Sequence, residues 1–241
     1  MTLWPATSAA LGVITPSGNR VVERVTIGIL AQFPEISCHF SRTPVFGSTD
    51  AYPDGYDWDG MLGAAALLDH ADPDLLVWNG SKAGGIRFAL DDELAARVSR
   101  KLTSSTLALR ELLIARNWRR IGLVTPYSAA GGAAVERTFT AEGYPCAAAV
   151  HAELADNLSY AAIPAEQIRA MCRRAAAARP DVIVAWCTNF PAAPLVAEIE
   201  AETGVPMLDS TSLAVWGALR ALGIDPRPAA AWGSIFAAPD A

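Results

Sequence analysis

The residue best suited to chemistry is Cys187, which closes an apolar run within 180–190 (PDVIVAWCTNF). A close copy of that run lies at 73–83 (PDLLVWNGSKA) and carries Gly80 where the first run carries the cysteine. A thiol at the end of a buried strand can donate a proton or, once deprotonated, attack as a nucleophile. Most free cysteines are simply small buried apolar residues, so both interpretations of Cys187 stay open at this point.

Hydrogen-bonding side chains stand in similar short segments. Tyr127, in the segment VTPYS, would donate its hydroxyl proton to a substrate oxyanion, although a tyrosine in a turn often only covers apolar surface. The other candidates are Ser17, Asn19, Ser81, Ser128, Thr188 and Asn189. Taken singly, each is also a typical helix cap or turn former. Lys82 would attract a dicarboxylate at the mouth of a site, or else is a solvated loop lysine.

Other kinds of catalytic centre find little support in the sequence. The three histidines, His39, His70 and His151, lack the spacing of metal ligands, and none stands near a strand-end segment. The G-x-S-x-G motif of a hydrolase nucleophile and the glycine-rich phosphate-binding motifs are missing. We therefore expect no metal, no organic cofactor and no triad that contains histidine.

Four apolar runs precede the candidate residues, at 11–15, 74–78, 120–125 and 181–186. These runs are apolar throughout instead of alternating, which is typical of parallel strands covered on both faces. Helices are predicted between and after them, at 90–102, 103–117, 165–180 and 212–222. Asp91 is the predicted N-cap of the first of these helices. The fold class is therefore α/β with open parallel sheets.

The chain also repeats itself in order. Matched segments begin at Leu11 and Ile121, at Asp72 and Arg179, and at Thr103 and Asp209. Three ordered matches about 110 residues apart predict two similar Rossmann-like α/β lobes with parallel sheets, related by a pseudo-twofold axis. We assign 1–105 plus 211–241 to the first lobe and 106–210 to the second.

The predicted lobes define a place for a ligand. Ligands gather beyond the carboxyl ends of parallel strands, so two facing lobes would place four loops around one cleft. Those loops are Thr15–Asn19, Gly80–Ala83, Thr125–Ser128 and Cys187–Asn189. Backbone N–H groups where a strand leads into a helix favour an anion, and a carboxylate is the natural one because the phosphate motifs are missing.

Composition narrows the class of protein. The chain has 241 residues, of which 52% are hydrophobic, and a formal net charge of −6 without a basic cluster that would bind nucleic acid. Four cysteines without close-pair spacing indicate free thiols in a reducing compartment. The first residues lack the pattern of a signal peptide, and no run is long enough to span a membrane. We expect a cytoplasmic enzyme with no membrane or nucleic-acid partner.

Twin lobes with a thiol position at a strand end of each resemble the aspartate/glutamate racemase superfamily, and within it the maleate cis–trans isomerases and arylmalonate decarboxylases. The resemblance covers nearly the whole chain. The segment VITPSGN is similar to the first substrate loop of this branch, which contains Pro16 and Ser17 and places Asn19 at a carboxylate-binding asparagine. The segments VTPY and LADNLSY likewise imply a catalytic role for Tyr127 and a carboxylate-binding role for Asn157.

One position departs from part of this branch. Its isomerases and racemases carry a cysteine in both lobes, whereas this chain has Cys187 at the second position and Gly80 at the first. The arylmalonate decarboxylases share the single-cysteine arrangement, and their loop after the glycine supplies hydroxyls to an oxyanion pocket. Here Ser81 keeps one hydroxyl and Lys82 replaces the other. The resemblance also implies a small dicarboxylate as substrate and is compatible with a homo-oligomer.

Three functions follow from these observations. The first is a cofactor-free decarboxylase of a malonate-type diacid, with Cys187 as the proton donor and an apolar wall that Trp78 and Trp186 would line, although both are as readily core residues. The second is an isomerase or racemase acting with one cysteine, with Lys82 or another group as the second base, and Gly80→Cys should create or enhance this activity. The third is a dicarboxylate-binding protein without turnover, whose affinity would survive Cys187→Ser.

Overall fold

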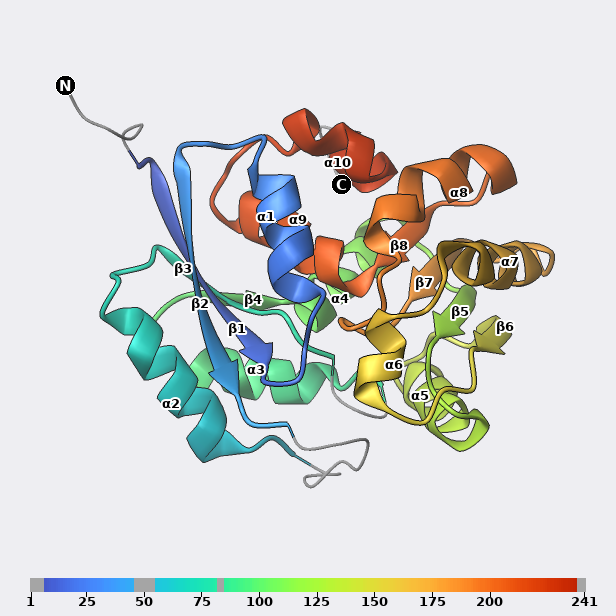
Figure 1. Cartoon of the computed structure of the whole chain (residues 1–241), viewed down its shortest axis with the longest axis horizontal. Helices are drawn as coiled ribbons and strands as arrows, with labels where there is room; N and C mark the ends of the chain where they lie inside the picture. The colour runs from blue at the N-terminus through green and yellow to red at the C-terminus, as the bar shows by residue number, and fades with distance from the viewer. Residues whose placement is uncertain (1–6, 46–54, 82–84, 238–241) are drawn as a thin grey trace.

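Two four-stranded parallel sheets form the centre of the molecule (Figure 1). The computed structural model describes residues 7–45, 55–81 and 85–237. The first sheet has the order β2-β1-β3-β4 and the second the order β6-β5-β7-β8, so the two have the same topology. Their strands are β1 Ala9–Pro16, β2 Ile36–Thr43, β3 Leu75–Trp78, β4 Leu102–Ser104, β5 Ile121–Thr125, β6 Cys146–His151, β7 Val182–Ala185 and β8 Met207–Asp209. The predicted α/β class and the two similar lobes are confirmed.

The central strands are the ones that the apolar runs predicted. Every residue of β3, β5 and β7 is buried, as a continuous apolar run between two layers of helices requires. The remaining strands escaped prediction for two reasons. The edge strands β2 and β6 are only partly buried and mix polar with apolar residues, while β4 and β8 have three residues each.

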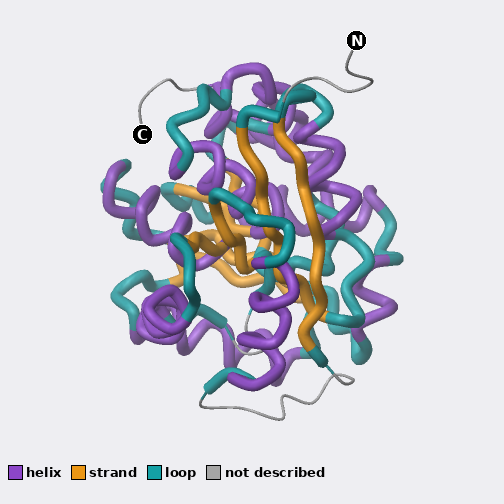
Figure 2. The backbone as a smooth tube through the Cα atoms, turned by 90° about the vertical axis from the view of Figure 1, so that its left-hand side faces the viewer, coloured by secondary structure: helices purple, strands orange, loops and turns teal. Residues whose placement is uncertain are grey.

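Helices cover both faces of each sheet, and Figure 2 shows them around the strands. The helices are α1 Val22–Leu30, α2 Trp58–Asp69, α3 Phe88–Arg97, α4 Ser105–Ala115, α5 Ala129–Ala141, α6 Asn157–Ala161, α7 Ala165–Ala176, α8 Val196–Thr203, α9 Ser210–Ala221 and α10 Ser234–Ala237, with 3-10 turns η1 Ala193–Leu195 and η2 Arg227–Trp232. None of the helices in the described ranges has the length and apolar character needed to cross a membrane.

Asp91 corrects one prediction. Helix α3 begins at Phe88, so Asp91 lies in its first turn instead of at its N-cap. The side chain is 1% exposed and its Oδ2 accepts a hydrogen bond from the Tyr56 hydroxyl at 3.0 Å. Burial raises the pKa of Asp91 to about 6, against hydrogen bonds from neighbouring hydroxyls that lower it. The carboxyl group is therefore an internal acceptor that holds Tyr56.

Helix α9 joins the two sheets. It follows β8 of the second sheet but packs against β3 and β4 of the first, and it also contacts α1 and α4. Gly217 permits the contact with α4, since a Cβ atom there would lie 2.8 Å from the Cβ of Ala108. One buried core consequently runs through both halves of the molecule. The exact division of the chain into two lobes stays a prediction.

Candidate active site

Cys187 lies directly beyond the end of β7, where a loop from the other sheet meets it. The residue is 5% exposed, and its backbone N–H donates to Oγ of Ser210 at 3.3 Å. The next backbone N–H, that of Thr188, donates to Oγ of Ser81 at 3.3 Å. Ser81 follows β3 of the first sheet, so the structure brings the two predicted strand-end segments into direct contact.

Tyr127 completes a cluster around the thiol. It follows β5 and packs edge-on against Tyr160 with ring centroids 5.5 Å apart. Burial, followed by the neighbouring Cys187 thiol, raises the pKa of Tyr127 well above its ordinary value, so the hydroxyl stays protonated. The hydroxyls of Tyr127 and Ser81 both act on the Cys187 thiol, where they lower its pKa. The arrangement supplies two neutral hydroxyl donors beside one sulfur.

The thiol itself is protonated at neutral pH. Burial raises the pKa of Cys187 to about 11, while hydrogen bonds from Tyr127 and from the Asn189 backbone oppose that rise. The other cysteines, Cys38, Cys146 and Cys172, are free, and burial raises the pKa of each to about 12. Cys187 differs from them because only its sulfur stands among hydroxyl groups at a strand end.

Three asparagines connect the loops around this cluster. Oδ1 of Asn19 accepts the backbone N–H groups of Val21 and Val22 at 2.8 Å each, where α1 begins. Its Nδ2 donates to Oγ1 of Thr188 at 3.1 Å. Asn189 accepts the backbone N–H of Arg20 at 2.8 Å. The asparagine side chains thus tie the start of α1 to the loop that carries the thiol.

Asn157, the first residue of α6, extends this network. Its Oδ1 accepts from Nδ2 of Asn189 at 3.0 Å, and its Nδ2 donates to the carbonyl oxygen of Gly18 at 3.0 Å. We call Asn19, Asn157 and Asn189 the asparagine network. Because these amide groups already have protein partners, a carboxylate bound by Asn157 would have to replace one of them.

Gly80 has no room for a side chain. A Cβ atom built on it would lie 2.3 Å from Cζ2 and Cη2 of Trp78. The indole is fixed in place, since its Nε1 donates to the Tyr56 hydroxyl at 3.2 Å and the two rings meet edge-on. Trp78 therefore lies beside Gly80. Trp186 instead packs edge-on against Phe139 in the core.

Two predicted hydroxyls make local contacts instead of joining the cluster. The Ser17 hydroxyl exchanges hydrogen bonds with the backbone of Val45, and Pro16 ends β1 in front of it. Ser128 is the exposed N-cap of α5 and accepts the backbone N–H of Gly131 at 3.3 Å. Lys82 lies outside the described residues.

His151 corrects the expectation that no histidine stands near a strand end. Its Nδ1 lies 2.8 Å from Oγ1 of Thr125, the last residue of β5, and its Nε2 lies 3.1 Å from Oε1 of Glu136. Gly132 makes space for the ring, because a Cβ there would lie 2.4 Å from it. The histidine comes from the end of the neighbouring strand β6, which the sequence did not reveal. Thr125 is fully buried, so this arrangement lacks an accessible nucleophile.

The start of α9 contributes residues that sequence reasoning missed. Oδ1 of Asp209 caps the helix by accepting the N–H groups of Thr211 and Ser212 at 2.9 Å each. The Thr211 hydroxyl donates to the carbonyl oxygen of Thr188 at 3.1 Å, and its own carbonyl accepts from Nδ2 of Asn79 at 3.2 Å. The repeat between TSST and DSTS was a usable signal, since both segments begin a buried helix at a strand end.

Asp209 is a buried carboxyl group whose charge acts on the Cys187 thiol. Burial raises its pKa to about 7, against the helix N–H bonds that lower it, and its charge in turn raises the pKa of Cys187. Oδ2 of Asp209 has no hydrogen-bond partner within the described part of the chain. Among those residues there is also no group of three or more His, Cys, Asp or Glu side chains arranged to hold a metal ion.

Known proteins share this architecture. A family model described as arylmalonate decarboxylase matches residues 84–236. The maleate isomerase of Nocardia farcinica is 29% identical over 227 residues, which is 89% of this chain and 90% of that protein. The solved maleate isomerase of Pseudomonas putida has a TM-score of 0.84 at 21% identity and covers 96% of this chain and 99% of its own. A solved arylmalonate decarboxylase has a TM-score of 0.70 at 18% identity, covering 94% and 98%.

Proposed function

We propose that this chain, which belongs to the arylmalonate decarboxylase family within the aspartate/glutamate racemase superfamily, is a cofactor-independent decarboxylase of a malonate-type diacid. Its characterised relatives are enzymes, both decarboxylases and maleate isomerases, and we therefore expect catalysis on a small dicarboxylate under either reaction. The choice between the two reactions depends on the number of groups that can do chemistry on opposite faces of a substrate.

One observation carries the proposal. The first-lobe counterpart of Cys187 is Gly80, and the direction of its missing side chain is occupied by the ring of Trp78. Racemisation by two bases needs a group on each face, and maleate isomerisation needs a nucleophile that adds to the double bond and leaves. Decarboxylation needs one proton donor and stabilisation of negative charge, which a single protonated thiol among hydroxyls can supply.

The site supports the following sequence of steps. The retained carboxylate binds at the asparagine network, and the bond from the α-carbon to the other carboxylate breaks. Its electron pair moves into an enediolate on the retained carboxylate, and CO2 leaves. Hydroxyls of Ser81 and Tyr127, with Thr188, stabilise the developing oxyanion; one such donor is typically worth about 3 kcal/mol of barrier. The apolar ring of Trp78 keeps water away from the leaving group.

Protonation then completes the reaction. The S–H bond of Cys187 breaks and its proton passes to the α-carbon, which leaves a thiolate and a monocarboxylate product. The Tyr127 hydroxyl donates to that thiolate, which recovers its proton from water. The raised pKa of the thiol, about 11, supports this role, because the group is a proton donor and not a nucleophilic thiolate at neutral pH.

Maleate isomerisation is the second candidate, and a specific observation favours it. Asn19, Asn157, Tyr127 and Cys187 all lie together, and the 29% identical relative is a maleate isomerase. An isomerase built on this site would have one thiol and would need Cys187 as the nucleophile, despite its raised pKa.

Proton NMR in D2O decides between the candidates, with phenylmalonate and maleate supplied separately to the purified protein. We expect deuterated phenylacetate from the wild-type protein and from Cys38→Ser, a control that removes a free thiol outside the site. The same product should be lost in Cys187→Ser. Fumarate from maleate, with phenylmalonate unchanged, would overturn the decarboxylase in favour of the isomerase. If neither phenylacetate nor fumarate forms and Cys187→Ser retains its affinity for the ligand, the chain is a binding protein without turnover.

A further inference from the structure

A pocket lies between the lobes, apart from the thiol. Its volume is about 580 Å3, and its walls come from the start of α1, from α6, from the turn around η1 and from η2. The lining residues that matter here are Arg20, Arg24, Leu158, Pro191, Pro194 and Trp232. None of the residues of the thiol cluster lines it, so a ligand there would be separate from one at Cys187.

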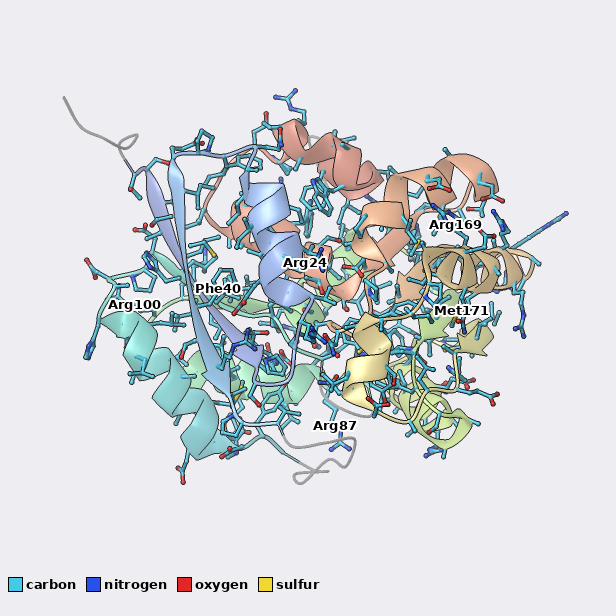
Figure 3. All side chains as sticks on the ribbon, in the orientation of Figure 1. Arg24, Phe40, Arg87, Arg100, Arg169 and Met171 are labelled. Atoms are coloured by element: carbon cyan, nitrogen blue, oxygen red, sulfur yellow. The ribbon has the colours of Figure 1, made fainter. Side chains whose placement is uncertain are left out.

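The pocket carries two cations without a partner. Arg20 and Arg24 are exposed and stand four residues apart at the start of α1, and Figure 3 shows Arg24 on the side of that helix toward the second lobe. Within the described ranges, no hydrogen bond or ion pair reaches either guanidinium group, whereas those of Arg110 and Arg173 bind carboxylates. Two like charges at this spacing repel each other, so an anion between them would relieve the repulsion.

The opposite walls of the pocket are apolar. Leu158 is 59% exposed although it lies beside the pocket, and prolines 191 and 194 line the turn next to it. Trp232 is partly buried, with its ring against Gly28 of α1. Among the residues that the structure describes, no carboxylate lines the cavity. A few polar groups facing an apolar wall are typical of a small-molecule site, and here they match a ligand with one charged end and one apolar end.

We propose that this pocket is a second ligand site, which binds a monocarboxylate with an apolar body such as an arylacetate or a branched alkyl acid. Its carboxylate lies between the guanidinium groups of Arg20 and Arg24, and its apolar body lies against Leu158 and Trp232. The site borders the asparagine network, because the backbone N–H of Arg20 donates to Oδ1 of Asn189. The proposal does not depend on which reaction occurs at Cys187.

The indole signal of Trp232 in 1H–15N NMR spectra reports on the pocket directly. It is assigned as the signal missing from Trp232→Phe, and the probes are phenylacetate, acetate and benzyl alcohol. Phenylacetate should shift the Trp232 signal to saturation, while acetate, without the apolar body, and benzyl alcohol, without the charge, should bind at least about 10-fold more weakly. An equal response to benzyl alcohol would overturn the carboxylate assignment.

Paired variants test the two walls. Arg20→Gln combined with Arg24→Gln should abolish the shift, and Leu158→Gln should weaken it. The controls are Arg116→Gln combined with Arg174→Gln, and Leu67→Gln, which change exposed residues elsewhere and should leave the titration unchanged. A shift that survives loss of both pocket arginines would overturn the proposal. So would a Trp232 signal that moves only with protein concentration, since the pocket would then be an interface between copies of the chain.

Discussion

Replacing Gly80 by cysteine is expected to destabilise this protein and not to supply a second reactive thiol. A Cβ atom at position 80 would lie 2.3 Å from two atoms of the Trp78 ring, closer than any normal contact. The ring cannot swing away freely, because it is 3% exposed and its Nε1 donates to Tyr56, whose hydroxyl in turn donates to the buried Asp91. Accommodating the new side chain requires this whole chain of contacts to move.

The size of the effect follows from the cost of overpacking. Inserting atoms into a closely packed region costs about 1–3 kcal/mol of unfolding free energy. In a chain of this length each kcal/mol lowers the melting temperature by about 2–4 °C, so a loss of about 4–8 °C is expected for the middle of that range. The control is Gly63→Cys, because a Cβ at Gly63 meets nothing within 4 Å and this exposed helix position should tolerate the change.

Trp78→Phe removes the two ring atoms that block position 80. Combined with Gly80→Cys, it should recover part of the lost stability, with a coupling energy of at least about 1 kcal/mol in a double-mutant cycle measured by thermal unfolding. Conversion of maleate to fumarate, followed by NMR in the same four proteins, should appear only in the double variant. If Gly80→Cys alone unfolds at the wild-type temperature and produces fumarate, Trp78 does not block the first-lobe position and the reasoning is wrong.

Two further substitutions test the surroundings of the thiol. Tyr127→Phe should lower kcat about 100- to 1,000-fold, as expected for loss of an oxyanion donor. It should also slow alkylation of Cys187, because the pKa of that thiol rises further when the Tyr127 hydroxyl is removed. An unchanged alkylation rate would contradict an interaction between the Tyr127 hydroxyl and the Cys187 thiol. Asp209→Asn should flatten the pH dependence of stability measured by urea unfolding. Burial raises the pKa of Asp209 from 3.8 to about 7 in the folded state. The protonated side chain therefore stabilises the fold below pH 3.8, and the free energy of unfolding falls by up to ~4 kcal/mol as the pH rises from 3.8 to about 7. The amide oxygen keeps the helix cap, and an unchanged slope between pH 4 and pH 8 would show that Asp209 does not titrate there.

The buried parts of the fold were predictable from sequence because burial leaves a compositional mark. Strands β3, β5 and β7 are covered on both faces and are therefore continuous apolar runs. The edge strands β2 and β6 face solvent on part of their surface, and their mixed composition resembles that of loops. The repeat was visible since both sheets use the same strand order and each central strand recurs.

The candidate site was only partly predictable, because several of its contacts depend on segments far apart in the chain. The segment around Cys187 was identifiable from its own residues, as was Tyr127. The contact of Thr188 with Ser81 spans 107 residues, and that of Asn79 with Thr211 spans 132. No local sequence pattern indicates that α9 crosses to the first sheet and brings its capped N-terminus to the ends of β3 and β7. The role of Asp209 as its cap is therefore known only from the structure.

The two lobes differ at their strand ends in the volume of the residue that stands two positions before Gly80 and Cys187. The pairing of β3 with β1 and of β7 with β5 places Trp78 and Ala185 at equivalent positions, two residues before Gly80 and Cys187. In one lobe alanine stands two residues before the cysteine, and in the other tryptophan stands two residues before the glycine. At position 80 the Trp78 ring occupies the space that a side chain would need. A cysteine at position 80 therefore requires both positions to change, and a lobe with alanine at 78 and cysteine at 80 should pack as the second lobe does.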